Sequence, residues 1–306
     1  MTGPTAVATD LDRVVDALRS GERFLLTAHE GPDGDALGSL LAMHHVLRQL
    51  GKDSVMFLHA KEFPLPVEYR FLPLEEVFHE PPADVVDRTL VFLDCGNIDR
   101  MPVEFLRRDG ARVVNIDHHH DNTRFGSVNL VDTEASCTAE IVLDVAKRLG
   151  ADITPEIASA LYVGLVTDTG KFMYENTGPA AHRMAAELIE AGVDVDDTYR
   201  RLYERVPIEK LRLIARALEK IERHDEGRFA VTYISADDYE ATGAGEVLTE
   251  GIIDFVRALE GTAVAAVGLV ADDGGGGHRR AAGFGSNLSY AELVDFLRAE
   301  VSAQIR

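Results

Sequence analysis

Cysteine is scarce in this chain. Only Cys95 and Cys137 are present, and neither has a second cysteine at the short spacings that zinc sites and redox motifs use. This scarcity argues against a disulfide-stapled secreted scaffold and indicates free thiols in a reducing compartment.

Basic side chains are also in deficit. The 306 residues include 31 lysines and arginines against 52 aspartates and glutamates, so the formal net charge is −21. Affinity for long nucleic acid depends on clustered lysine and arginine, and this charge therefore excludes a general nucleic-acid-binding protein. A phosphate-bearing substrate would have to be held locally, by metal ions or by a few basic residues.

Long apolar runs are absent as well. No stretch approaches the roughly 18 uncharged apolar residues that suggest a membrane-spanning helix. Residues 1–18 carry acidic side chains and lack the basic start and apolar run of a signal peptide. These features predict a cytoplasmic protein without a membrane partner.

The first part of the chain alternates short apolar runs with helical patterns. Such continuous apolar strands, alternating with helices, are typical of a parallel α/β sheet covered on both faces by helices. The expected strands are 24–28, 54–58, 89–93 and 112–116, and the expected helices are 36–50, 136–149, 155–166 and 178–192.

The second part predicts a smaller α+β domain. Its expected helices are 208–221, 249–259 and 290–301, and its expected strands are 229–234 and 263–270. The polar interval between the two parts is interpreted as a linker, and the length suits two domains. The predicted division is therefore 1–192, a linker at 193–207, and 208–306.

The segment HEGPDGDALGS directly follows the first predicted strand. Its His29, Asp33 and Asp35 stand between a strand and a helix, which in an open parallel sheet is where ligands bind. The alternative is a surface loop in which one aspartate merely caps the following helix.

Polar side chains also end three other apolar segments. Asp94 follows TLVFL, Asp117 and His118 follow RVVNI, and Asp168 stands in GLVTDTG. Each alone is more often a turn or cap residue than a ligand. Because the carboxyl ends of parallel strands meet at one edge of a sheet, the four sites together predict a shared metal centre.

The donor set consists of two imidazoles and four carboxylates, and it suits manganese, magnesium, zinc or iron rather than a closed structural zinc site. Six ligands exceed what one catalytic ion needs, so two divalent ions sharing a carboxylate fit better. Such a pair activates water and clamps both oxygens of an in-line displacement, which predicts phosphoester or pyrophosphate hydrolysis. The expected ligands are His29, Asp33, Asp35, Asp94, His118 and Asp168.

Taken in order, these motifs resemble the DHH phosphoesterase superfamily. The resemblance rests on HEGPDGDALGS, the Asp94–Cys95 pair, DHH at 117–119 and TDTG at 167–170. The GGGGHRRAAGF segment resembles the companion DHHA1 domain, and the two cover nearly the whole chain. The motifs and length are most similar to the NrnA-type bifunctional oligoribonucleases and 3′-phosphoadenosine-5′-phosphate (PAP) phosphatases.

The resemblance implies a role for each matching residue. One ion would be held by His29, Asp33 and Asp94, and the other by Asp35, Asp94, His118 and Asp168, with Asp94 bridging. His119 would face the scissile phosphate, stabilising charge or protonating the leaving oxygen, and Asp117 would orient His118. The implied ion is manganese, with magnesium as the alternative, and relatives commonly form homodimers.

The DHHA1-like segment would present the substrate. Glycine backbone amides can approach a phosphate closely, and the histidine and two arginines add positive charge to an acidic protein. The alternatives are a flexible linker and a solvated arginine pair. Only Ala271–Asp273 separate the preceding strand from the glycines, where the family places a further strand and helix. The expected binding residues are Gly275, Gly276, Gly277, His278, Arg279 and Arg280.

The predicted function is metal-dependent hydrolysis of short oligoribonucleotides, including di-adenylates, and of PAP. The alternatives within the superfamily are a RecJ-like single-strand DNA exonuclease and an inorganic pyrophosphatase. A third alternative is not an enzyme: a sensor that binds a cyclic dinucleotide without cleaving it. The complete ligand set argues against the sensor, because a protein that only binds a nucleotide does not need two metal sites.

Overall fold

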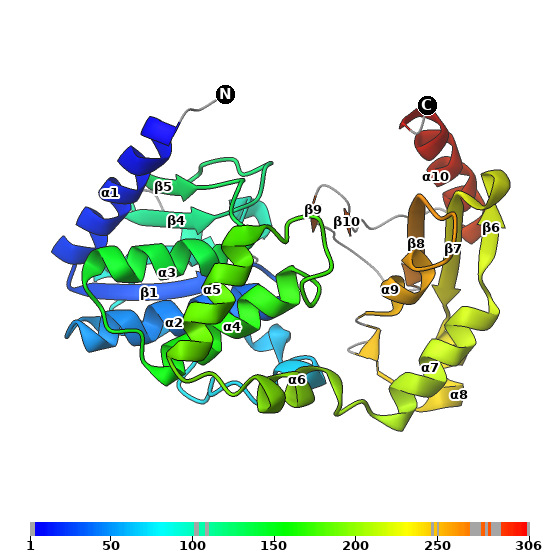
Figure 1. The fold of residues 1–306 in the computed structure, drawn as a ribbon, viewed down its shortest axis with the longest axis horizontal. Helices are drawn as coiled ribbons and strands as arrows, with labels where there is room; N and C mark the ends of the chain where they lie inside the picture. The colour runs from blue at the N-terminus through cyan, green and yellow to red at the C-terminus, as the bar shows by residue number, and fades with distance from the viewer. Residues whose placement is uncertain are drawn as a thin grey trace. The chain divides into compact units, whose positions relative to one another are not determined.

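The computed structural model describes residues 4–100, 104–107, 110–245, 248–249, 251–269, 277–278, 281–282 and 289–304. The chain forms two compact units (Figure 1). The first unit comprises residues 1–64 and 71–202, and the second comprises residues 65–70 and 203–306.

A parallel five-stranded sheet forms the centre of the first unit, with the strand order β2-β1-β3-β4-β5. The fifth strand is missing from the prediction because it is short and three of its four residues are only partly buried. The strands are β1 (Arg23–Ala28), β2 (Asp53–Met56), β3 (Thr89–Leu93), β4 (Val113–Asp117) and β5 (Val128–Val131).

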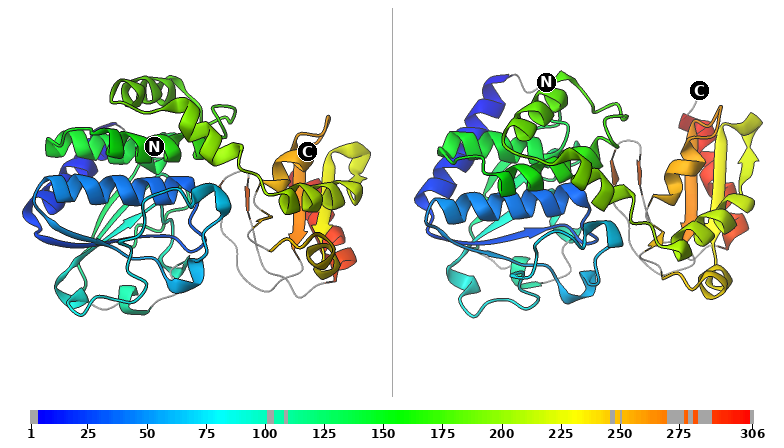
Figure 2. Two further views of the ribbon diagram at one scale, coloured as in Figure 1. Left: turned by 90° about the horizontal axis from the view of Figure 1, so that it is seen from below. Right: turned by 60° about the horizontal axis from the view of Figure 1, so that its bottom comes forward.

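Helices α1 (Pro4–Ser20), α2 (Gly34–Gln49) and α3 (Thr138–Leu149) pack on this sheet. Helix α4 (Pro155–Asp168) packs on α2 and α3 as a second layer, and α5 (Pro179–Glu190) packs on α4 (Figure 2). The prediction of a parallel sheet flanked by helices is confirmed.

One apolar cluster of the core packs against short 3-10 turns, whereas the sequence predicted that α-helices would cover both faces of the sheet. Phe92, Leu90 and Phe57 pack there with Leu106, Val85 and Ile98 of short 3-10 turns. These turns are Val85–Asp87, Ile98–Arg100 and Glu104–Arg107. The apolar strands are thus buried by turns and loops as well as by helices.

Glycines let α2 and α4 approach each other closely. A Cβ added at Gly38 would lie 2.4 Å from the carbonyl oxygen of Ala160, and one added at Gly164 would lie 2.7 Å from Oδ1 of Asp35. Because no side chain separates the two backbones, the carboxylate of Asp35 lies directly against α4.

The second unit has a three-stranded sheet in the order β6-β7-β8, antiparallel between β6 and β7 and parallel between β7 and β8. Residues of α7, α9 and β7 form one apolar cluster, and residues of β7 and α10 form another. The elements are α7 (Ile208–Glu219), β6 (Glu222–His224), β7 (Phe229–Ile234), α8 (Ala236–Thr242), α9 (Ile252–Arg257), β8 (Val264–Leu269), β9 (Gly277–His278), β10 (Ala281–Ala282) and α10 (Tyr290–Gln304).

The interval predicted as a linker contains helix α6 (Val195–Tyr203). Its Thr198 and Leu202 are buried, and the Arg201 guanidinium lies over the ring of Phe71, 5.6 Å from the centroid. The helix is hard to recognise because charged pairs spaced four residues apart dominate its sequence. The division at 1–192, 193–207 and 208–306 stays a prediction.

Within the part of the chain that the structure describes, no helix combines the length and the apolar character that crossing a membrane requires.

Candidate metal centre

The candidate site lies at the carboxyl ends of β1 and β3. From β1 the chain continues to β2, toward one edge of the sheet, and from β3 it continues to β4, toward the opposite edge. Such a topological switch point opens a crevice beside the strand ends, where ligands of open α/β sheets bind. His29 follows β1 and Asp94 follows β3, so both stand at this point.

Asp33 serves as the N-cap of α2, as the alternative interpretation expected. Its Oδ1 accepts hydrogen bonds from the backbone amides of Asp35 and Ala36, both at 3.0 Å. A ligand atom of Asp33 nevertheless lies within 4.8 Å of ligand atoms of His29 and Asp94. Capping uses one carboxylate oxygen and leaves the other for a cation, so the two interpretations are compatible.

Asp94 occupies an unusual backbone conformation. Its φ is 57°, in the left-handed region that non-glycine residues rarely adopt. Strain of this kind persists where the surrounding structure fixes it, and it is common at functional sites. The turn buries the carboxylate to 2% exposure and directs it at the imidazoles that follow β1 and β4.

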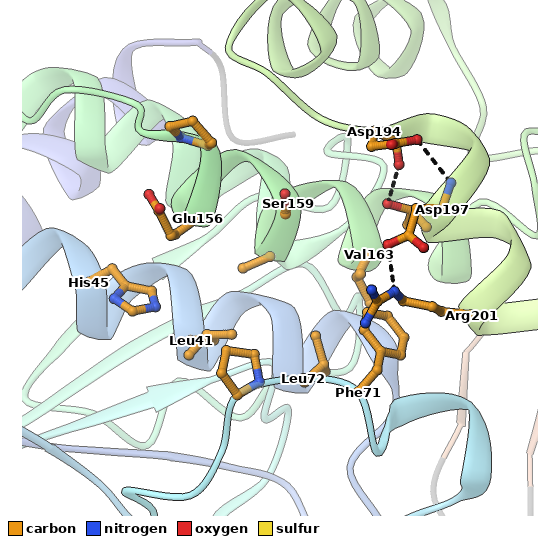
Figure 3. Close-up of a pocket in the computed structure, with 14 residues that line it drawn as sticks. Leu41, His45, Phe71, Leu72, Glu156, Ser159, Val163, Asp194, Asp197 and Arg201 are labelled. Atoms are coloured by element: carbon orange, nitrogen blue, oxygen red, sulfur yellow. Dashed lines mark hydrogen bonds and ion pairs between the residues drawn. The ribbon is translucent and has the colours of Figure 1, made fainter.

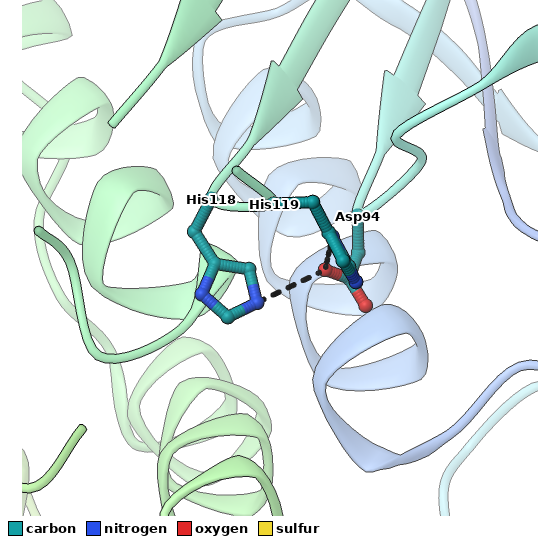
Figure 4. Close-up of side chains that lie close together, drawn as sticks. All are labelled: Asp94, His118 and His119. Carbon is teal, nitrogen blue, oxygen red and sulfur yellow. Dashed lines mark ion pairs between the residues drawn. The ribbon is translucent and has the colours of Figure 1, made fainter. Parts of the chain in front are cut away.

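The Asp94 carboxylate lies between three histidine rings. Its Oδ2 is 3.5 Å from Nε2 of His29, and its Oδ1 is 3.7 Å from Nε2 of His118 and 3.6 Å from Nδ1 of His119. Figure 4 shows the two rings of the DHH segment converging on this side chain. A carboxylate in this position can contact two cations at once.

The N-terminus of α3 holds two of the carboxylates, a role that the sequence did not predict. Backbone amides of Thr138 and Ala139 donate to Asp35 Oδ2 and Oδ1, at 2.6 and 2.9 Å. The Thr138 hydroxyl donates to Asp94 Oδ1 at 2.9 Å. These donors and the positive end of the helix dipole favour the ionised carboxylates in a fixed orientation.

Replacing Thr138 with valine should therefore weaken metal binding. Valine keeps the shape and the backbone amide but removes the hydroxyl that fixes Asp94, and such supporting hydrogen bonds are worth about 10- to 100-fold in metal affinity. Calorimetric titration of the metal-free protein with Mn²⁺ measures the effect, and Thr138→Ser should restore the affinity. Equal affinities for valine and serine variants would contradict this role.

Asp168 is the last residue of α4 and not the end of a strand. Its Oδ2 lies 3.9 Å from Nε2 of His118 and accepts a hydrogen bond from Asn176 Nδ2 at 3.0 Å. A carboxylate is unfavourable at the negative end of a helix, so a bound cation would stabilise it there.

The structure brings all six expected ligands together. In each of three sets, one ligand atom per residue lies within 4.8 Å of the others. Asp94 belongs to two of the sets and His118 to two, so the sets share members. They are His29–Asp33–Asp94, Asp35–His118–Asp168 and Asp94–His118–His119.

Burial and mutual repulsion disfavour the ionised forms of Asp33 and Asp35, whereas the imidazoles favour the ionised form of Asp94. Burial, followed by the charge of Asp94, raises the pKa of Asp33, and the same causes raise the pKa of Asp35 further. Burial also acts on Asp94, but the hydrogen bond from His29 and the neighbouring imidazoles hold its pKa below the usual range.

Divalent cations would offset this repulsion. Carboxylate oxygens and imidazole nitrogens are the donors that magnesium, manganese, zinc and iron accept, so the residues fit the implied ions. The nearby Cys137 thiol is buried, and its burial and the charges of Asp35 and Asp168 raise its pKa well above the usual range. Cys137 belongs to none of the three ligand sets found among the described residues.

The partner of Asp117 differs from the prediction. Asp117 Oδ1 lies 2.7 Å from Nδ1 of His119, and Oδ2 accepts from Asn122 Nδ2 at 2.5 Å. The expected partner was His118. Asp117 ends β4, and along an extended chain side chains two apart share a side while adjacent ones point apart. Asp117 therefore orients His119.

Backbone contact also fixes the tautomer of His29. Its Nδ1 lies 2.8 Å from the carbonyl oxygen of Glu30, which can only accept a hydrogen bond. Nδ1 must therefore carry the proton, and Nε2 is directed at Asp94 and any cation beside it.

Four of the six predicted substrate-loop residues lie outside the part of the chain that the structure describes. Gly275, Gly276, Arg279 and Arg280 lie outside the described residues. The other two, Gly277 and His278, form β9, which pairs antiparallel with β10. Their substrate-binding role stays a prediction.

A separate cavity of about 330 Å³ lies in the first unit, between α2, α4, α6 and residues 71–73 (Figure 3). Its lining mixes apolar side chains such as Leu41 and Phe71 with Glu156 and Arg201. None of the six expected ligands is among its lining residues. We assign this cavity no part in the metal chemistry.

Comparison with known proteins identifies relatives of this chain. A family model described as "DHH family, N-terminal domain" matches residues 23–165. The bifunctional oligoribonuclease and PAP phosphatase NrnA of Thermus thermophilus is 33% identical over 320 aligned residues, covering 94% of each protein.

Solved structures show the same fold. An exopolyphosphatase-related protein from Bacteroides fragilis superposes with a TM-score of 0.84 at 20% identity, covering 97% of this chain and 96% of that one. RecJ from Thermus thermophilus in complex with Mn²⁺ gives a TM-score of 0.51 at 16% identity, covering 97% of this chain and 54% of that one.

Proposed function

This chain belongs to the DHH phosphoesterase family and to its NrnA-type members, and from that premise we propose that it uses two divalent metal ions to hydrolyse short oligoribonucleotides and PAP. The observation that carries the proposal is the clustering of the six expected ligands in sets linked through Asp94 and His118. Support for the substrate comes from the name of the Thermus relative, which aligns along 94% of its length.

The two ions would share Asp94. His29 and Asp33 would complete one site, and Asp35, His118 and Asp168 the other. When bound, the ions activate water and polarise the phosphoryl oxygens of the substrate. Manganese is the first ion to test, because the donors suit it and because RecJ, a structural neighbour, was solved with Mn²⁺.

His119 acts on the substrate in this proposal. Its Nδ1 donates to Asp117, whose other oxygen is held by Asn122, so the ring has a fixed orientation. The Nε2 atom then presents a proton to the leaving oxygen as the phosphoester bond breaks. Asp117 supports the positive charge of the protonated ring and is not itself a proton donor.

A substrate panel tests the proposal. It comprises di- to pentaribonucleotides, PAP, cyclic di-adenylate, pyrophosphate and single-stranded DNA, each with Mn²⁺, with Mg²⁺ or with a chelator. We expect mononucleotide from the ribonucleotides and inorganic phosphate from PAP, both lost on chelation and restored by Mn²⁺. Pyrophosphate or DNA as the preferred substrate would favour an alternative enzyme, and binding of a cyclic dinucleotide without any product would favour a sensor.

Two further features belong to the proposal. Pairing of two chains through the first unit is expected from the family, and sedimentation equilibrium measures it as twice the mass of 33.5 kDa. A cytoplasmic location, expected from the composition, would be read from cell fractionation.

A further inference from the structure

The loop that follows Asp168 has a strained but well-fixed backbone. Gly170, Lys171 and Phe172 have φ values of 54°, 63° and 65°, three left-handed residues in succession. Non-glycine residues adopt this conformation only where the surroundings impose it. Here the amide of Lys171 donates to the Val166 carbonyl at 2.8 Å, and the amide of Phe172 donates to the Thr169 hydroxyl at 3.2 Å.

Side-chain packing fixes the same loop. A Cβ at Gly170 would lie 2.2 Å from ring atoms of Tyr174, so that ring packs on the glycine backbone. Asn176 donates to both the carboxylate and the carbonyl of Asp168, which closes the loop on an expected metal ligand. These contacts tie the loop to Asp168 and to its own backbone.

This loop carries an aromatic pair on its surface. The ring of Phe172 stacks on the ring of His182 in α5, with centroids 5.2 Å apart and an angle of 22° between the planes. His182 is exposed and Phe172 is half-buried. Beside them, the side chain of Met173 is 73% exposed. Because the His182 ring is exposed, this stacked pair lies at the surface and is not part of the apolar core.

A basic residue adjoins each ring in the sequence. Lys171 precedes Phe172, Arg183 follows His182, and both are exposed. In a chain with a net charge of −21, neighbouring basic residues at an aromatic surface are a distinct local feature. Aromatic rings that stack bases, together with basic residues that track the backbone, are how proteins bind single-stranded nucleic acid.

The loop that carries Phe172 begins and ends beside Asp168, an expected metal ligand. Residues 169–176 form a loop whose two ends meet at Asp168. Half of an eight-residue loop reaches at most about 14 Å, at roughly 3.5 Å per residue. A nucleotide whose phosphate lies on the metal ions can therefore place a base at the loop.

We propose that Phe172 and His182 form a stacking platform for a nucleobase of the substrate, with Lys171 and Arg183 drawing in its phosphates. The inference rests on the proposed function and names the chemistry that the enzyme recognises beyond the phosphate. Stacking accepts any base, so the platform selects nucleotides over base-free phosphates without selecting a sequence.

The test compares substrates with and without a base. His182→Ala should lower kcat/KM for a diribonucleotide by about 5- to 150-fold, the range for loss of one base–aromatic stack. The change should come through KM. The same variant should cleave an abasic dinucleotide at the wild-type rate and should bind Mn²⁺ with wild-type affinity. His182→Phe should restore stacking and most of the activity.

Phe78→Ala provides the matched control, because Phe78 is another exposed aromatic side chain of the first unit, at 44% exposure. It should cleave both substrates at the wild-type rate. Equal losses of His182→Ala on the base-bearing and abasic substrates would overturn the platform, because a structural role would affect both. No loss on either would overturn it too.

A direct binding measurement separates this inference from the proposed function. Quenching of a 2-aminopurine dinucleotide on wild-type protein, with a weaker response in His182→Ala, supports the platform even if no hydrolysis occurs. Hydrolysis by wild-type protein without a difference between the variants in quenching leaves the proposed function intact and refutes the platform.

Discussion

Replacing Asp94 with asparagine should lower turnover of a diribonucleotide by about a thousandfold or more. Asp94 stands within reach of three imidazoles and belongs to two of the three ligand sets, so its charge serves both expected ions. Metal ions supply several kcal/mol of transition-state stabilisation, and each 1.36 kcal/mol is about tenfold in rate.

Asparagine is the suitable substitution because of the backbone. At a φ of 57°, alanine would add strain, whereas asparagine tolerates the left-handed region and keeps the side-chain shape. Loss of activity in this variant therefore reports the missing charge. Its metal-free melting temperature should stay near that of the wild type, and its Mn²⁺ titration should show both sites weakened.

Asp132 offers a matched control. It directly follows β5, as Asp94 follows β3, but it belongs to none of the three ligand sets. Asp132→Asn should retain turnover and metal binding. Wild-type turnover in Asp94→Asn, or an equal loss in Asp132→Asn, would show that Asp94 does not bridge two ions.

Replacing His119 with glutamine should lower kcat by about 10²- to 10⁴-fold, the contribution of a positioned general acid. The variant should keep its affinity for Mn²⁺, because the proposed ligand sets are complete without this ring. Stopped assays of PAP hydrolysis measure kcat, and calorimetric titration with Mn²⁺ measures the affinity.

The neighbouring His120 supplies the control for this variant. It continues the same run of histidines but is exposed. His120→Gln should cleave PAP at the wild-type rate. If His119→Gln instead loses Mn²⁺, then His119 is a ligand together with Asp94 and His118, a set that the distances allow. The proton donor would then have to be another group.

Much of the first unit follows from local sequence. The run TLVFL predicts β3 at the residues where it occurs, Thr89–Leu93, because a continuous apolar stretch of this length is buried on both faces of a parallel sheet. Asp94 directly follows this buried strand, and a surface role is therefore not expected for it. The fold class and the family could be predicted from the sequence because strand patterns and motifs are local.

Two other elements could not be predicted from the sequence because of their composition or length. Helix α6 carries charged residues at four of its nine positions, and its buried side is limited to Thr198 and Leu202. Strand β5 is only four residues long and mostly half-buried. Short or highly charged elements give weak periodicity, and it is packing against the rest of the unit that stabilises them.

By itself, the sequence determined the kinds of side chains at the site and their positions at the ends of elements, because each motif directly follows its own apolar segment. Only the tertiary structure decided which groups contact each other. Thr138 is 44 residues from Asp94 along the chain. Asp117 contacts the His119 ring through one carboxylate oxygen and the Asn122 side chain through the other. Hydrogen bonds act over about 3 Å, so such partnerships depend on how helices and strand ends pack in space.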